Sequence, residues 1–147
     1  MSDISGFITV LEAAQAKAKF TPEVQEAAQG IDIEALKAGF AAAIAMGETD
    51  NISDEAQSAA LKAGFEFAVK AVLMLKTAPG PFEMLDLYAN FKVARGETVE
   101  KPGMFDMKKK SMFNAWEKIK HISTPKAQAQ YIKHVNEYIG KYDTRDE

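Results

Sequence analysis

The 147-residue sequence contains no cysteine, so it can form no disulfide bond and offers no thiolate for catalysis or metal binding. The two histidines, His121 and His134, are far apart, and neither lies at metal-ligand spacing with an acid or another histidine. The few serines do not occur in the context of an activated nucleophile. We therefore expect a protein that is not an enzyme, with no catalytic residues, no bound metal and no resident cofactor.

Long apolar runs and a strong excess of one charge are also lacking. The most apolar stretches, residues 40–46 and 65–75, are shorter than the ~20 residues that span a bilayer. Asp3 lies near the N-terminus, and no basic segment precedes an apolar one, so we expect no secretory signal. The net charge of −3 gives no global attraction to nucleic acid. These features predict a soluble, cytoplasmic protein that is a monomer, has no transmembrane segment and does not bind nucleic acid.

Apolar residues make up 47% of the chain, enough for a folded core, and they recur at the three- and four-residue spacing of amphipathic helices. No segment alternates with period two for long enough to predict a strand. The sequence therefore indicates an all-α fold. We expect helices over about residues 4–19, 22–30, 32–47, 54–75, 81–94, 108–120 and 124–140, a loop over 95–107, and a frayed charged tail from Asp143.

Two stretches of the chain resemble each other: residues 34–40 read EALKAGF and residues 59–65 read AALKAGF. A duplicated helix would explain the resemblance. Alanine-rich helices also imitate one another by chance, so both explanations remain open.

The segment from Met84 to Trp116 has the features of a ligand site. Tyr88, Phe91 and Lys92 are spaced i, i+3 and i+4, which places two aromatic rings and one ammonium group on the same face of a helix. Aromatic rings can stack on a base, and a neighbouring cation can bind phosphate. The alternative for the two rings is packing in the core.

Three consecutive lysines, residues 108–110, follow a Pro-Gly turn and open the next expected helix. Free backbone N–H groups and the positive end of the helix dipole favour anions there. The same dipole makes lysines unfavourable at this end, so the run weakens the helix and a binding role would explain it. The alternative to a binding role is that the three lysines form a basic turn exposed to solvent.

Several short motifs occur in a fixed order between about residues 65 and 142. They are Leu75-Lys76 followed by Pro79, Met84-Leu85, Tyr88-x-x-Phe91-Lys92-x-Ala94, Lys101-Pro102-Gly103-Met104-x-Asp106-x-Lys108-x-Lys110, Phe113-x-Ala115-Trp116, and Ala129-x-Tyr131-Ile132 with Val135. With these motifs the C-terminal half of the chain resembles the acyl-CoA-binding protein family, a four-helix domain that holds long-chain acyl-CoA thioesters.

The resemblance implies a set of ligand-binding positions. Tyr88, Phe91 and Lys92 match a helix face that stacks the adenine and holds the ribose 3′-phosphate. Lys108 matches a lysine near the CoA phosphates, and Tyr131 matches a tyrosine of the last helix that faces the ligand. The full expected acyl-CoA-binding set is Met84, Leu85, Tyr88, Phe91, Lys92, Lys108, Lys110, Met112 and Tyr131.

Three positions depart from the family pattern. Phe91 replaces a usual tyrosine, Met112 replaces a phosphate-binding lysine, and Leu73 replaces a lysine of the first domain helix. One lost phosphate contact costs on the order of one to a few kcal/mol. Lys109 and Lys110 can compensate for the charge missing at Met112, so we expect binding to survive in a weaker form.

The resemblance divides the chain into a helical N-terminal extension, residues 1–52, an acyl-CoA-binding domain, residues 53–142, and the charged tail, residues 143–147. We expect a four-helix bundle with additional N-terminal helices that dock on it and extend its first helix. The expected function is non-catalytic binding, buffering and intracellular transport of medium- and long-chain acyl-CoA, with acyl-CoA-using enzymes as possible recipients. The alternatives are a helical protein-interaction module that lost the ligand, and a regulatory domain for an enzyme on another chain.

Overall fold

The computed structural model describes residues 3–147, and the regular elements in that range are all helices joined by loops, as the sequence predicted. The only β pairing among these residues is one isolated antiparallel bridge between Leu75 and Thr144. Seven α-helices and one 3₁₀ helix follow one another in this range: α1 (Ser5–Gln15), α2 (Pro22–Ala28), α3 (Ile33–Ala45), α4 (Glu55–Ala71), η1 (Val72–Met74), α5 (Pro81–Ala94), α6 (Met107–Ile119) and α7 (Thr124–Tyr142).

Most helices begin where local sequence signals place them. An oxygen of the residue before the helix accepts a hydrogen bond from the backbone of the first turn in α3, α4, α6 and α7, which satisfies one of the free N–H groups there. Proline occupies the first turn of α2, α5 and α7, where it has no N–H to lose. The capping residues are Asp32, Asp54, Asp106 and Ser123.

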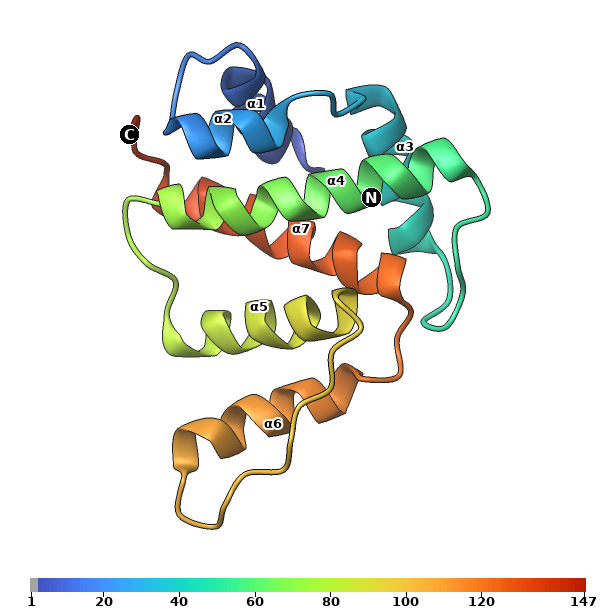
Figure 1. The fold of residues 1–147 in the computed structure, drawn as a ribbon, viewed down its shortest axis with the longest axis vertical. Coiled ribbons are helices and arrows are strands. Elements are labelled where there is room, and N and C mark those ends of the chain that lie inside the picture. Colours follow the sequence, from blue (N-terminus) through green and yellow to red (C-terminus); the bar gives the residue numbers. More distant parts are fainter. Residues whose placement is uncertain (1–2) are drawn as a thin grey trace.

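Helices α4 and α7 lie side by side in the middle of the molecule (Figure 1). Helices α1, α2 and α3 cover one side of this pair, and α5 and then α6 lie on the other (Figure 1). One continuous core joins the two sides. Phe67 of α4 meets Phe7 of α1 edge to face, with ring centroids 5.8 Å apart, whereas Phe65 meets Tyr131 of α7 at 5.1 Å. The N-terminal helices therefore dock on the bundle, as expected.

Helices α3 and α4 approach so closely that a side chain added at either of two glycines would force a neighbour to shift. A Cβ at Gly64 would lie 2.6 Å from Cδ1 of Leu36, and one at Gly39 would lie 2.7 Å from the carbonyl oxygen of Gln57. Both glycines belong to the two similar stretches, which thus pack against each other. The extension does not lengthen α4, contrary to our expectation, because a loop over residues 46–54 separates α3 from α4.

Two expected helix ends were wrong. Helix α1 ends at Gln15 rather than Lys19, because the backbone reverses through positive φ angles at Lys17 (58°) and Phe20 (76°). Helix α7 continues through Gly140 to Tyr142. A glycine inside a helix costs only about 1 kcal/mol, and the packing of neighbouring α7 side chains outweighs that cost.

The expected fraying of the tail was also wrong. Thr144 is buried, and its neighbours hydrogen bond to the segment that follows α4: Lys76 N–H donates to the Asp143 carbonyl at 2.9 Å, and Arg145 N–H donates to the Met74 carbonyl at 2.8 Å. The Phe20 N–H donates to the carbonyl of Asp146. Because α4 ends in a 3₁₀ turn, it leaves backbone groups free to pair with the tail.

Candidate functional site

A mostly apolar groove of about 520 Å³ runs between α5 and α6. Five of the expected site residues converge on it, namely Met84, Leu85 and Tyr88 of α5 with Lys108 and Met112 of α6. Met84 is 51% exposed, so part of this apolar wall faces solvent. The groove thus combines an apolar trough with a lysine from the first turn of α6, an arrangement suited to a ligand with an apolar tail and an anionic head.

Pro81, Phe82 and Ser111 also line this groove, although they were not among the expected site residues. A signal existed for two of them. Phe82 lies three residues before Leu85, and Ser111 lies three residues after Lys108, so each shares a helix face with an identified residue. The Ser111 hydroxyl donates to the Met107 carbonyl at 3.1 Å.

Lys92 lies one turn beyond Tyr88 on α5. Its Nζ is 5.8 Å from the centroid of the Tyr88 ring and 3.6 Å from Oε1 of Glu97. The expected pairing of ring and cation on one helix face is therefore present. The Lys92–Glu97 pair is partly exposed and contributes at most about 1 kcal/mol, so an anionic ligand can compete for the ammonium group.

Phe91 is half-buried and packs in an aromatic cluster that spans three helices. Its ring centroid lies 6.2 Å from that of Phe65 in α4 and 6.5 Å from that of Tyr131 in α7. The Arg95 guanidinium lies 4.7 Å from the centroid of the same ring and donates to Glu66 Oε2 at 2.7 Å. Phe91 therefore contributes to the core as well as to the face that bears Tyr88.

Tyr131 is buried, with 4% of its surface exposed, and it does not line the groove between α5 and α6. Burial raises the pKa of its hydroxyl above the ordinary value, although the nearby Arg95 acts in the opposite direction. The phenol therefore stays protonated over the physiological range and keeps a hydrogen to donate.

The lysine run occupies the first turn of α6, as expected, and all three side chains are exposed. Asp106 offsets their unfavourable interaction with the helix dipole. Its Oδ1 accepts a 3.0 Å hydrogen bond from the Lys109 backbone, and its Oδ2 lies 3.9 Å from the Lys109 ammonium. Lys108 alone of the three lines the groove, so Lys109 and Lys110 lie beside the site rather than in it.

The two departures at charged positions differ in their surroundings. Met112 is half-buried and forms part of the groove wall. Leu73, in η1, is 69% exposed. The groove thus has one more apolar side chain where the family pattern has a cation, and the end of α4 presents an apolar side chain to solvent.

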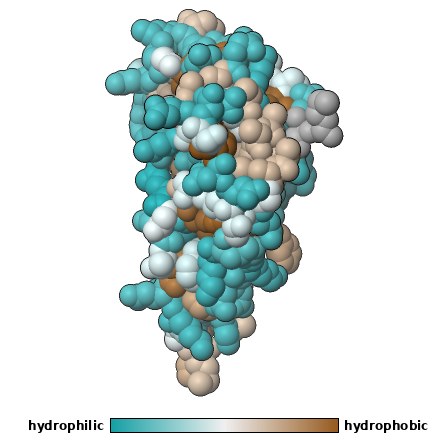
Figure 2. Space-filling model, turned by 90° about the vertical axis from the view of Figure 1, so that its right-hand side faces the viewer, coloured by the Kyte–Doolittle hydropathy of each residue, from teal (hydrophilic) through white to brown (hydrophobic). Residues whose placement is uncertain are grey.

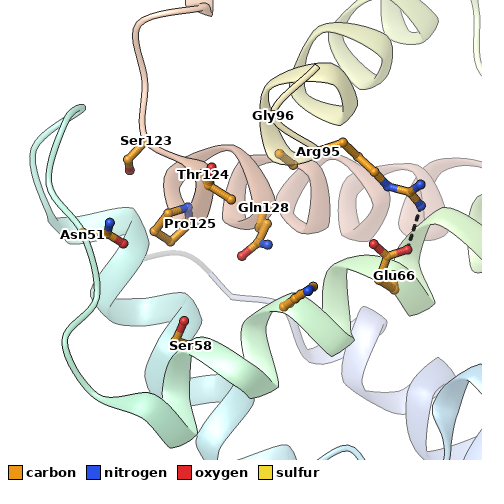
Figure 3. Close-up of a pocket in the computed structure, with 11 residues that line it drawn as sticks. Asn51, Ser58, Glu66, Arg95, Gly96, Ser123, Thr124, Pro125 and Gln128 are labelled. Atoms are coloured by element: carbon orange, nitrogen blue, oxygen red, sulfur yellow. Dashed lines mark hydrogen bonds and ion pairs between the residues drawn. The ribbon is translucent and has the colours of Figure 1, made fainter. Parts of the chain in front are cut away.

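A second cavity, of about 700 Å³, lies between α4, the end of α5 and the start of α7 (Figure 3). Its lining includes several polar side chains: Gln128 of α7, which is 6% exposed, faces Ser58 of α4 across the space, and the Arg95–Glu66 ion pair closes one side (Figure 3). Lys62 of α4 also lines the cavity. No local sequence pattern predicts this cavity, because its residues come from four separated segments. Asn51 in the loop before α4 also contributes to it.

Within residues 3–147, no group of three or more histidine, cysteine, aspartate or glutamate side chains is arranged to hold a metal ion. Among these residues, none of the helices combines the length and the hydropathy that a bilayer-spanning segment needs.

The structure is thus a helical bundle with a mostly apolar groove beside lysines, the arrangement of a small-molecule binding domain. The chain belongs to the acyl-CoA-binding protein family: the sequence model of that family, described as "Acyl CoA binding protein", matches residues 62–135. This range contains all nine expected site residues, and the resemblance seen in the sequence is confirmed.

Individual relatives agree with the family match. "Acyl-CoA-binding protein homolog 1" of Caenorhabditis elegans is 42% identical over 80 residues, which cover 53% of this chain and 93% of the relative. "Acyl-CoA-binding protein" of Saccharomyces cerevisiae is 42% identical over 82 residues, or 54% of this chain and 94% of the relative. "Acyl-CoA-binding protein 2" of Saccharomyces pastorianus is 40% identical over 82 residues, with the same coverage. These matches span nearly the whole of each relative but only about half of this chain, so its additional helices lie largely outside them.

Proposed function

We propose that this protein binds fatty acyl-CoA thioesters without chemical change. The observation that carries the proposal is the convergence of Met84, Leu85 and Tyr88 with Lys108 on one groove between α5 and α6. Family membership supports the same ligand, since the relatives are named for acyl-CoA binding.

The acyl chain would lie in the groove against Met84, Leu85 and Met112. Each methylene group removed from water contributes about 0.8 kcal/mol, so a chain of several carbons adds substantial binding free energy. Free CoA lacks this contribution, and free fatty acid lacks the phosphates. The protein would therefore prefer the complete thioester to either of its parts.

The nucleotide end would be held by the Tyr88 ring and the cations around it. Lys92, close to that ring, would pair with the ribose 3′-phosphate, and Lys108 with the phosphates nearer the groove. Lys110 would add charge from the same helix turn. Phe91 and the neutral Tyr131 hydroxyl would complete the adenine side of the site.

In the cell, such binding would buffer medium- and long-chain acyl-CoA and carry it to enzymes that consume it. Residues 53–142 would supply the ligand-binding domain. The extension, residues 1–52, would stabilise that domain by covering faces of α4 and α7.

Calorimetric titration of the full chain with palmitoyl-CoA, free CoA and palmitate at two salt concentrations tests the proposal. We expect one-to-one binding of palmitoyl-CoA, weaker binding of CoA, and an affinity that falls as salt screens the lysines. Lys92→Ala should weaken palmitoyl-CoA binding by roughly tenfold, the loss of one charge-assisted contact. Lys133→Ala, which removes an exposed lysine elsewhere on α7, is the matched control.

The absence of heat and of any thermal shift with all three ligands would contradict the proposal. The departures at Met112 and Leu73 would then favour a helical protein-interaction module that has lost the ligand.

A further inference from the structure

Four large apolar side chains project into solvent on the side of the molecule formed by α5, α6 and the loop between them, away from the N-terminal helices. Phe105 is 91% exposed, Phe82 83%, Met104 75% and Met107 68%. Phe82 belongs to the first turn of α5, and the others to the loop before α6 and its first residue. This loop forms the lower extremity of the chain in Figure 1, and apolar atoms mark the same end in Figure 2. We call these four residues the apolar tip.

The three tip residues before and at the start of α6 lie in a basic segment of the chain. Residues 101–110 contain four lysines and a single acid, Asp106, whose carboxylate already caps α6. The segment therefore carries a net charge of +3, although the whole protein carries −3. Lysines close to exposed aromatic and methionine side chains suit an anionic lipid surface, in which the apolar groups enter the headgroup boundary and the ammonium groups contact phosphates and carboxylates.

We propose that the apolar tip docks this protein on anionic phospholipid bilayers; the inference rests on the proposed acyl-CoA function. Phe82 and Lys108 both line the groove between α5 and α6, so the tip includes the edge of the groove itself. Docking brings that edge to the bilayer surface. An acyl chain then passes between bilayer and groove without crossing a layer of water, so its methylene groups stay out of contact with water.

The shape of the tip favours a bilayer over a protein partner. Met104 and Phe105 protrude from a short turn that follows Pro102-Gly103, and no groove receives them. A protein partner would need a cavity that matches this protrusion, whereas the fluid headgroup region of a bilayer deforms around it. Exposed aromatic side chains on a soluble protein otherwise favour aggregation, so their accumulation at one basic end indicates a use.

Co-sedimentation of the full chain with vesicles tests the proposal. One set contains phosphatidylcholine alone, and the other contains added phosphatidylserine. We expect sedimentation with the anionic set, reversed by salt, and little with the neutral set. Phe105→Ser should weaken the partitioning roughly tenfold. Leu73→Ser removes an exposed apolar side chain outside the tip and should leave the partitioning unchanged, and Lys109→Gln should weaken it.

The side chain of Phe105 makes little contact with the protein, so Phe105→Ser should preserve the melting temperature and the palmitoyl-CoA affinity measured without vesicles. The proposal is overturned if the wild-type chain does not sediment with anionic vesicles, or if Phe105→Ser sediments as the wild type does. Neither of these two results would contradict the proposed binding of acyl-CoA. A chain that sediments but binds no palmitoyl-CoA in solution instead contradicts the proposed function, and with it the transfer of acyl chains through the tip.

Discussion

The Arg95 guanidinium lies 4.7 Å from the centroid of the Phe91 ring and, in the same position, donates a 2.7 Å hydrogen bond to Glu66. Arg95 follows α5 and Glu66 belongs to α4, so this pair ties the end of one helix to the face of another. It also holds Phe91 against the core. One turn earlier, Tyr88 lines the groove. Two aromatic residues on one helix face therefore have different surroundings.

Alanine substitutions should separate the roles of these two rings. Phe91→Ala removes a ring that packs on Phe65 and Tyr131, and it should lower the free energy of unfolding by about 3 kcal/mol. Tyr88→Ala should cost less stability and should weaken palmitoyl-CoA binding by roughly tenfold, since this ring lines the groove. Urea denaturation and calorimetry on both variants measure the two quantities. Equal losses of stability and equal losses of affinity would contradict the distinction.

Restoring a cation in the groove should strengthen ligand binding. Met112 lines the groove on the same face of α6 as Lys108, one turn away. Met112→Lys should therefore raise palmitoyl-CoA affinity several-fold and steepen its dependence on salt, because a further ammonium can reach the phosphates. Met112→Leu keeps the groove apolar and is the control. A lysine variant that binds no better than the leucine variant would show that the phosphates lie out of reach of this position.

Glu83 should make stability depend on pH in the acid range. The Tyr142 hydroxyl, the Gly80 N–H and the Lys141 ammonium contact its carboxylate and hold its pKa at about 2, below the usual 4.5. A carboxyl with a lowered folded-state pKa stabilises the fold above its unfolded pKa, and that contribution disappears as pH falls from 4.5 to about 2.

Glu83→Gln should accordingly be less stable than wild type at pH 7 and should converge on it near pH 2. Urea midpoints over that range provide the measurement. Asp86→Asn, an exposed carboxyl on the same helix, is the control. A difference between Glu83→Gln and wild type that does not change with pH would show that the carboxylate charge contributes nothing.

The N-terminal extension should be required for full stability. Phe7 is completely buried and packs on Phe67 of α4, so Phe7→Ala should cost about 3 to 5 kcal/mol. Deletion of residues 1–52 should lower stability further, because it exposes the faces of α4 and α7 that these helices cover. Thermal melts of both proteins, with the exposed substitution Thr9→Ala as a control, provide the test. A deleted chain as stable as the full one would argue for an independent domain.

Much of the fold could be predicted because its signals are local. Asp32 and Asp54 cap the helices that follow them through hydrogen bonds to residues three positions away, a relationship visible in the sequence itself. Helical spacing and the family motifs likewise made it possible to predict that Tyr88, Lys92 and Lys108 belong to the site. Because these residues lie on α5 and α6, the groove forms where the two helices pack beside each other.

The features that could not be predicted depend on contacts between distant residues. Gly140 is typical of a helix end, but α7 continues through it to Tyr142 because the residues on both sides of Gly140 pack against the rest of the molecule. The tail pairs with residues about seventy positions earlier, and nothing near Thr144 in the sequence marks its partner. The polar cavity beside Gln128 forms only where four separated segments meet, so it cannot be predicted from the helical periodicity of any one segment.

The pairing of residues 143–146 has a consequence for limited proteolysis by endoproteases. These proteases bind an extended, unpaired segment, and here the carbonyl of Asp146 accepts from Phe20 while Thr144 is bridged to Leu75. Cleavage between residues 143 and 146 should therefore be slow for as long as the bundle is folded. The rate of cleavage there would report how often the native structure opens at the point where Phe20, the segment after α4 and residues 143–146 meet.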